Sequence, residues 1–129
     1  MNESGAAALA ATMADAADLA EIDRCCQLLN VVIAEKTLGV QEDCDFHLAI
    51  ARASKNQFFV SVIASMQQQV LCSMNLMRNM SLVKSIARQK LVRAEHLAIV
   101  EALKRRDAQA AGAAMRRHLE NAQERMFNR

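Results

Sequence analysis

The residues with the clearest chemical potential are one aspartate and the only three histidines of the chain. Asp43 precedes His47 by four positions, and the other two histidines are His96 and His118. Residues four apart on an α-helix share a face, roughly 6 Å apart along its axis, so Asp43 and His47 could reach one ion. Three imidazoles and a carboxylate suit a borderline divalent metal such as zinc, nickel, cobalt, manganese or iron.

His96 and His118 could join that pair only through the fold. They are separated by 22 residues, and a straight helix of that length would span ~33 Å, so a turn near Asp107 must bring them together. Each lies on or beside an apolar stripe, where an unpaired imidazole is costly. Spacing alone leaves another interpretation open, because a helical histidine is often a hydrogen-bonded core residue and short D-x-x-x-H spacings recur by chance.

The elements that must position these groups are predicted to be helices. The chain has 129 residues, of which 53% are hydrophobic, with no proline and three glycines. It is rich in alanine, leucine, methionine, glutamine and arginine, which favour helices. Short loops between helices favour antiparallel packing, so we expect an all-α bundle of about six helices. The expected helices are 3–13, 15–36, 41–53, 57–79, 81–106 and 107–127, with Asp15, Asn56, Ser81 and Asp107 as caps and a break at 37–39.

Composition limits the classes of protein to consider. The net charge of +2 is too small to indicate nucleic-acid binding by this segment. The cysteines, Cys25, Cys26, Cys44 and Cys72, form no C-x-x-C pair, and we interpret them as buried thiols of a reducing compartment. No signal peptide and no apolar run long enough for a membrane span is evident, so a cytoplasmic protein is expected.

Four sequence segments resemble one family. The segment DCDFHLAIARASKN (43–56) resembles the D-x-x-F-H-x-x-I-x-x-A-S-x-N motif of the FadR C-terminal (FCD) domain. AEHLAIVEALKRRDAQAA (94–111) and AMRRHLE (114–120) are similar to that family's E-H-x-x-I and M-x-x-H-L motifs, and ESGAAALAA (3–11) is similar to its first-helix pattern. FCD domains are the effector-binding halves of bacterial GntR-type transcriptional regulators, and their fold is a bundle of six or seven helices.

The resemblance implies a ligand set and an effector. Metal-binding FCD domains hold the ion with one aspartate and three histidines, which correspond here to Asp43, His47, His96 and His118. Asp45 is nearer to His47 in sequence but does not match the motif. Zinc is the first choice of metal, and the implied effector is a small carboxylate, closest in style to the lactate, pyruvate and glycolate sensors. A homodimer is the expected assembly.

The resemblance also bears on domain organisation. We expect residues 1–129 to form one FCD domain whose first helix looks truncated. Full regulators of this type carry an N-terminal winged helix-turn-helix, and nothing similar precedes Glu3. DNA binding would then belong to an absent N-terminal domain, and the chain would be a fragment or a truncated gene product.

Helix faces suggest effector contacts. Gln89 is seven residues before His96, Asn121 is three after His118, and Ser54 is seven after His47. Arginine is the better clamp for a carboxylate; Arg52, Arg78 and Arg93 are candidates, of which Arg93, three before His96, is preferred. The alternative is ordinary boundary hydrogen bonding for the polar residues and solvation for the arginines.

Three functions are compatible with these residues. The leading hypothesis is a sensor in which a metal anchors a small carboxylate. A metalloenzyme is the second, because an open metal position could activate water; against it, the sequence has no H-E-x-x-H, and Glu95 points off the His96 face. A structural dimerisation bundle with an empty pocket is the third. The sequence therefore predicts a non-enzymatic sensor.

Overall fold

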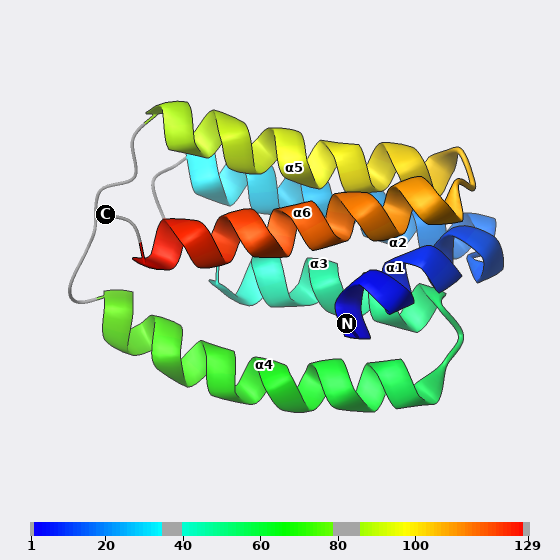
Figure 1. Ribbon diagram of the computed structural model, residues 1–129, viewed down its shortest axis with the longest axis horizontal. Helices are drawn as coiled ribbons and strands as arrows, with labels where there is room; N and C mark the ends of the chain where they lie inside the picture. The colour runs from blue at the N-terminus through cyan, green and yellow to red at the C-terminus, as the bar shows by residue number, and fades with distance from the viewer. Residues whose placement is uncertain (1, 35–39, 79–85, 128–129) are drawn as a thin grey trace.

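The computed structural model describes residues 2–34, 40–78 and 86–127, and all regular structure in these ranges is helical (Figure 1). The predicted all-α class is confirmed. The helices are α1 (Asn2–Met13), α2 (Ala16–Ala34), α3 (Val40–Ala53), α4 (Gln57–Arg78), α5 (Ile86–Lys104) and α6 (Ala108–Phe127).

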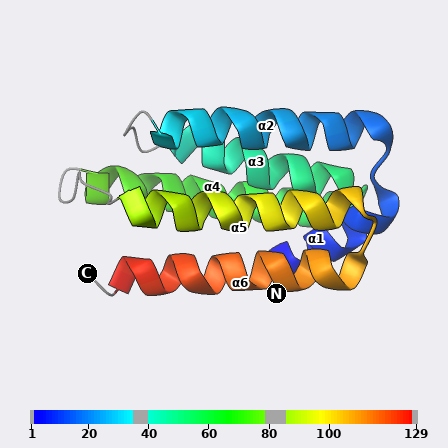
Figure 2. The same cartoon turned by 90° about the horizontal axis from the view of Figure 1, so that it is seen from above.

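The helices form a bundle in which α1 is short and central. α1 packs on α6, α3, α4 and α5, whereas the longer α4 packs, among the described residues, only on α3 and α1. Seen from above, α2 and α6 lie at opposite edges of the bundle (Figure 2). The described part of the chain contains no helix long and apolar enough to cross a membrane.

Three helices begin at the caps predicted from sequence. The Asp15 carboxylate accepts a hydrogen bond from the Asp18 backbone N–H at 2.8 Å, and the Asp18 carboxylate accepts one from the Asp15 backbone N–H at 2.9 Å. Asn56 caps α4 by accepting from the Phe58 N–H, and Asp107 caps α6. Each cap satisfies a backbone donor that the helix leaves free. The predicted Ser81 cap and the break at 37–39 lie outside the described residues.

At one end of the bundle, long side chains from two tight turns form polar contacts with the start of α2 and the link before it. Lys55 follows α3 and Arg106 follows α5, both at φ 60°, in the left-handed region where glycine is more usual. The Lys55 ammonium lies 2.6 Å from Asp18, and the Arg106 guanidinium donates to the Ala14 carbonyl. One side chain from each turn therefore contacts either the link between α1 and α2 or the first turn of α2. We call Ala14, Asp15, Asp18, Lys55 and Arg106 the turn end.

The core combines large side chains of the outer helices with small ones from α1. Its largest fully buried apolar members are Ile22, Leu29, Phe46, Ile50, Ile99, Leu103 and Met115. Alanines of α1 let neighbouring helices approach closely: a Cβ on Gly112 of α6 would lie 3.4 Å from Ala8. Burial raises the pKa of Cys26 and of Cys44 to about 11, which keeps these two thiols protonated and unreactive.

Candidate metal centre

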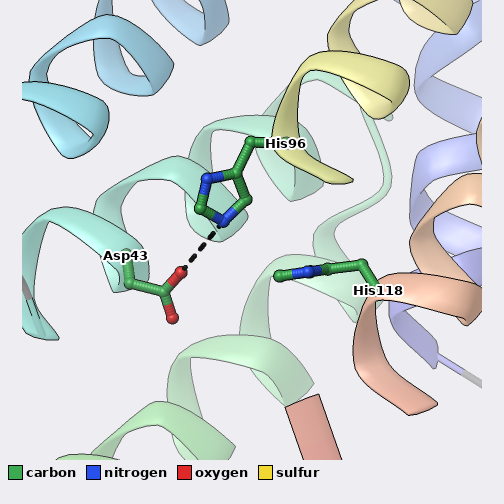
Figure 3. A group of neighbouring side chains, drawn as sticks. All are labelled: Asp43, His96 and His118. Atoms are coloured by element: carbon green, nitrogen blue, oxygen red, sulfur yellow. Dashed lines mark ion pairs between the residues drawn. The ribbon is translucent and has the colours of Figure 1, made fainter. Parts of the chain in front are cut away.

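Helix α3 and the two consecutive helices α5 and α6 place polar side chains at one point between them. Asp43 of α3, His96 of α5 and His118 of α6 each offer one donor atom, and the three atoms lie within 4.8 Å of one another (Figure 3). In the described residues, no Cα atom of α3 lies within 8 Å of one in α5 or α6. The space between α3 and the α5–α6 pair is therefore bridged by side chains.

His47, one turn after Asp43, lies beside this trio. Its Nε2 is 3.5 Å from Asp43 Oδ1. Its ring stacks on that of His118, with centroids 5.5 Å apart and planes 17° apart. The structure thus brings all four predicted ligands into one neighbourhood, with His47 outside the tightest group. We call Asp43, His47, His96 and His118 the Asp–His centre.

The centre holds a buried nitrogen without a hydrogen-bond partner. The His96 side chain is 1% exposed, and its Nε2, 3.9 Å from Asp43 Oδ1, forms no hydrogen bond (Figure 3). An unsatisfied buried polar atom costs on the order of 1–3 kcal/mol. A divalent ion accepts the same lone pair, so the donor set and the orphaned nitrogen both fit a metal.

The other ring nitrogen of each histidine faces an oxygen from a different helix. Such contacts fix which nitrogen carries the proton and leave Nε2 for the centre. The Nδ1 contacts are His47 to Glu3 (2.7 Å), His96 to Asn30 (3.4 Å) and His118 to Glu95 (2.8 Å). The contact between His47 Nδ1 and Glu3 is short, but its geometry does not meet that of a hydrogen bond. Sequence reasoning missed Asn30, Glu3 and Glu95 as partners.

Charges within the centre are strongly coupled. Burial alone would raise the pKa of Asp43, but the charge and hydrogen bond of His47 and the other histidines lower it to about 2. Burial alone would lower the pKa of His47, but Asp43 and Glu3 raise it to about 10. At His96, burial and repulsion from the neighbouring imidazoles lower the pKa to about 3. Asp43 is therefore ionised and His96 is neutral near pH 7.

The residues predicted to contact an effector differ in their exposure and in their hydrogen bonds. The Ser54 hydroxyl donates to the Ala51 carbonyl in the turn after α3, and Asn121 donates to Glu95 at 2.9 Å. Gln89 is half-buried, Arg52 and Arg93 are exposed, and the side chain of Arg78 lies outside the described residues. These six residues stay predictions.

An all-helical bundle that buries three histidines beside a half-buried aspartate defines the class of protein: a helical domain with a polar site between its helices. The FCD domain model matches residues 3–121, so the chain belongs to the FCD domain family. The resemblance to the FCD domain of a GntR-type transcriptional regulator is confirmed.

Two curated relatives are transcriptional regulators. The chain is 34% identical over 128 residues to the Uxu operon transcriptional regulator of Escherichia coli (strain K12), covering 97% of this chain and 49% of that protein. It is 30% identical over 122 residues to the HTH-type transcriptional regulator LutR of Bacillus subtilis (strain 168), covering 95% of this chain and 56% of that protein. The chain thus spans about half the length of these relatives. Its family is regulatory rather than enzymatic.

Proposed function

We propose that this chain is the sensing domain of a transcriptional regulator, which binds a divalent metal and, through it, a small carboxylate effector. The observation that carries the proposal is the buried Nε2 of His96, which forms no hydrogen bond and faces Asp43, with a donor atom of His118 within 4.8 Å. Leaving this nitrogen unsatisfied would be costly in a domain built only for packing.

The metal would be held by the four residues of the Asp–His centre, and zinc is the proposed ion. Nitrogen ligands with a single carboxylate favour zinc over magnesium or calcium, which prefer oxygen. A bound divalent ion would supply a Lewis acid that accepts a carboxylate oxygen. The ion would displace the proton that Asp43 and Glu3 stabilise on His47, and one ionised aspartate with three neutral imidazoles would then leave the site with a net charge near +1, which favours an anionic effector.

The regulatory output would require a further domain. The printed name of LutR describes an HTH-type regulator, and we propose that the complete protein likewise contacts DNA through a helix-turn-helix domain. The sensing domain would form a homodimer and shift the spacing of the paired DNA-binding domains. The effector can do this only by binding one arrangement of the helices more tightly than another.

The test is a thermal-shift screen of small organic acids, with and without zinc, on protein stripped by a chelator. We expect zinc to raise the melting temperature, and one carboxylate to raise it further only in the zinc-loaded protein. Lactate, pyruvate and glycolate are the first acids to include.

Product analysis separates a sensor from an enzyme. A sensor returns the stabilising acid unchanged after prolonged incubation, whereas an enzyme converts it. Stabilisation by an acid in the absence of metal would contradict the metal-anchored mechanism. No binding of zinc, cobalt, nickel, manganese or iron would overturn the metal site itself and leave a structural bundle.

A further inference from the structure

Glu95 occupies the interface between α5 and α6 with both carboxylate oxygens engaged. His118 Nδ1 lies 2.8 Å from Oε1, and Asn121 donates to Oε2 at 2.9 Å. Arg125 forms a two-pronged pair, with Nη2 to Oε1 at 2.8 Å and Nη1 to Oε2 at 2.9 Å. The Glu95 side chain is only 10% exposed. Its orientation is therefore fixed by contacts on both oxygens.

These contacts determine the state of the His118 ring. Arg125 donates to both oxygens of Glu95 and Asn121 donates to one of them, so the Glu95 side chain is placed as an ionised carboxylate that accepts hydrogen bonds. An ionised carboxylate only accepts hydrogen bonds, so His118 must carry its proton on Nδ1. Nε2 is then left with a free lone pair on the side of the ring away from Glu95.

The three partners of Glu95 share one face of α6. His118, Asn121 and Arg125 stand at positions i, i+3 and i+7 of the helix. Glu95 is also the neighbour of His96 on α5, so one carboxylate sets the distance between the two helices at the point where both present an imidazole. A plain α5–α6 ion pair would need Arg125 alone, whereas here the same carboxylate also meets a residue of the centre.

We propose that Glu95 is a positioning residue of the Asp–His centre: it holds His118 as the Nδ1-protonated tautomer with Nε2 available to a metal. Asn121 and Arg125 hold Glu95 in turn. This role rests on the metal binding proposed above. The alternative is that Glu95 only stabilises the packing of α5 on α6.

The experiment compares Glu95→Gln with wild type in two measurements. The first is the dissociation constant for zinc and for cobalt, by competition with a chelating dye, together with the visible spectrum of the cobalt-loaded protein. We expect the variant to bind roughly 10–100-fold more weakly, the usual effect of removing such an outer partner. The second is the ¹⁵N chemical shifts of His118 in metal-free protein, where we expect one tautomer in wild type and a mixture in the variant.

Two further variants separate positioning from packing. Asp23→Asn removes another ion pair between helices, Asp23 of α2 with Lys104 of α5 at 3.5 Å, which does not contact the centre. It should leave metal affinity and the His118 shifts unchanged. Arg125→Met removes the two-point ion pair with Glu95 but keeps the carboxylate on His118, so it should weaken metal binding less than Glu95→Gln at a similar loss of thermal stability. If Glu95→Gln does not fold, Glu95→Asp, whose carboxylate is one methylene group shorter, carries the tautomer measurement: a mixture of His118 tautomers supports the positioning role and a single unchanged tautomer overturns it.

The possible results decide between the two claims. If wild type binds metal and folded Glu95→Gln binds it equally tightly, the positioning role is wrong while the proposed function stands. If both variants at the α5–α6 interface lose stability but neither loses metal affinity, Glu95 is a packing residue. Wild-type protein that binds neither zinc nor cobalt overturns the proposed function, and the positioning role with it.

Discussion

The turn end and the Asp–His centre both bring charged and polar side chains together, but they differ in whether the chain itself supplies a partner for each polar atom. At the turn end, charged groups at the surface pair with caps and carbonyls supplied by the chain, as Lys55 does with Asp18 and Arg106 with the Ala14 carbonyl. At the centre, three imidazoles are buried, and His96 Nε2 has no hydrogen-bond partner. The turn end is complete as it folds. The centre leaves one buried nitrogen without a hydrogen bond, and this is the difference that the proposed metal would remove.

The largest expected effect is metal binding at the centre. Adding zinc to chelator-treated protein should raise its stability by about 4 kcal/mol when free zinc is a thousand times the dissociation constant. Melting curves at several zinc concentrations measure this increment. Magnesium is the control, because it prefers oxygen ligands and should have no effect. Equal melting temperatures with and without zinc would remove the contrast between the two regions.

The second effect tests the orphaned nitrogen directly. In metal-free protein, His96→Leu removes the unsatisfied Nε2 together with the long Nδ1 contact to Asn30 (3.4 Å), so the free energy of unfolding should rise by no more than about 1 kcal/mol. The same variant should lose the response to zinc. Urea unfolding in the presence of a chelator measures the first expectation.

The matched control is His118→Leu. His118 is hydrogen-bonded to Glu95, so this substitution should lower the stability of the metal-free protein. If both leucine variants lower stability to the same degree, His96 Nε2 has a hydrogen-bond partner in solution and the centre is complete without metal.

The third effect tests the turn end. Arg106 adopts φ 60° and donates to the Ala14 carbonyl. Arg106→Gly relieves the left-handed conformation but loses the hydrogen bond, so the two effects should nearly cancel. Arg106→Ala loses the bond and keeps the conformation, so it should be about 1 kcal/mol less stable than the glycine variant. Urea unfolding of both variants gives the difference, and an alanine variant as stable as the glycine one would contradict the observed turn.

The smallest effect is the acid dependence of the Asp18 contacts. The hydrogen bond from Lys55 and the capping contacts with Asp15 lower the pKa of Asp18 below its ordinary 3.8. Its contribution is therefore present above about pH 4 and is lost as the pH falls through the lowered value. Asp18→Asn should cost less than about 1 kcal/mol at pH 6.

Urea unfolding at about pH 6 and about pH 2.5 should show the difference between Asp18→Asn and wild type shrinking in acid. A difference that grows with acidity would have the wrong sign for a lowered pKa. The zinc increment offers an internal comparison, because metal binding also weakens in acid as the ligands take up protons.

The local features of the fold were predictable because they depend on neighbours in sequence. Asp15, Asn56 and Asp107 cap helices as predicted, since a cap needs only its own side chain and the next few backbone donors. The end of α5 was placed two residues too late. The structure ends this helix at Lys104 and places Arg106 in a left-handed turn. Glycine is the usual sequence signal of such a turn, and this one has none.

The centre was predictable only in part. The spacing of Asp43 and His47 indicated one helix face, whereas their meeting with His96 and His118 depended on the family motifs. Glu95 was set aside because it points off the His96 face, and the structure directs it instead across to α6. Any buried imidazole needs a partner on its second nitrogen, which was the available signal, but the sequence does not say which helix supplies it.

The wide separation of α3 from α5 and α6 has a consequence for the order of folding. His96 and His118 are 22 residues apart on two helices joined by a tight turn, whereas Asp43 is 53 residues before His96. Closing the shorter loop costs less chain entropy, so we expect the α5–α6 hairpin to form early and α3 to dock on it late. Side chains, rather than close backbone packing, then bridge the final gap. A metal would thus act mainly on the rate of unfolding, by slowing the departure of α3.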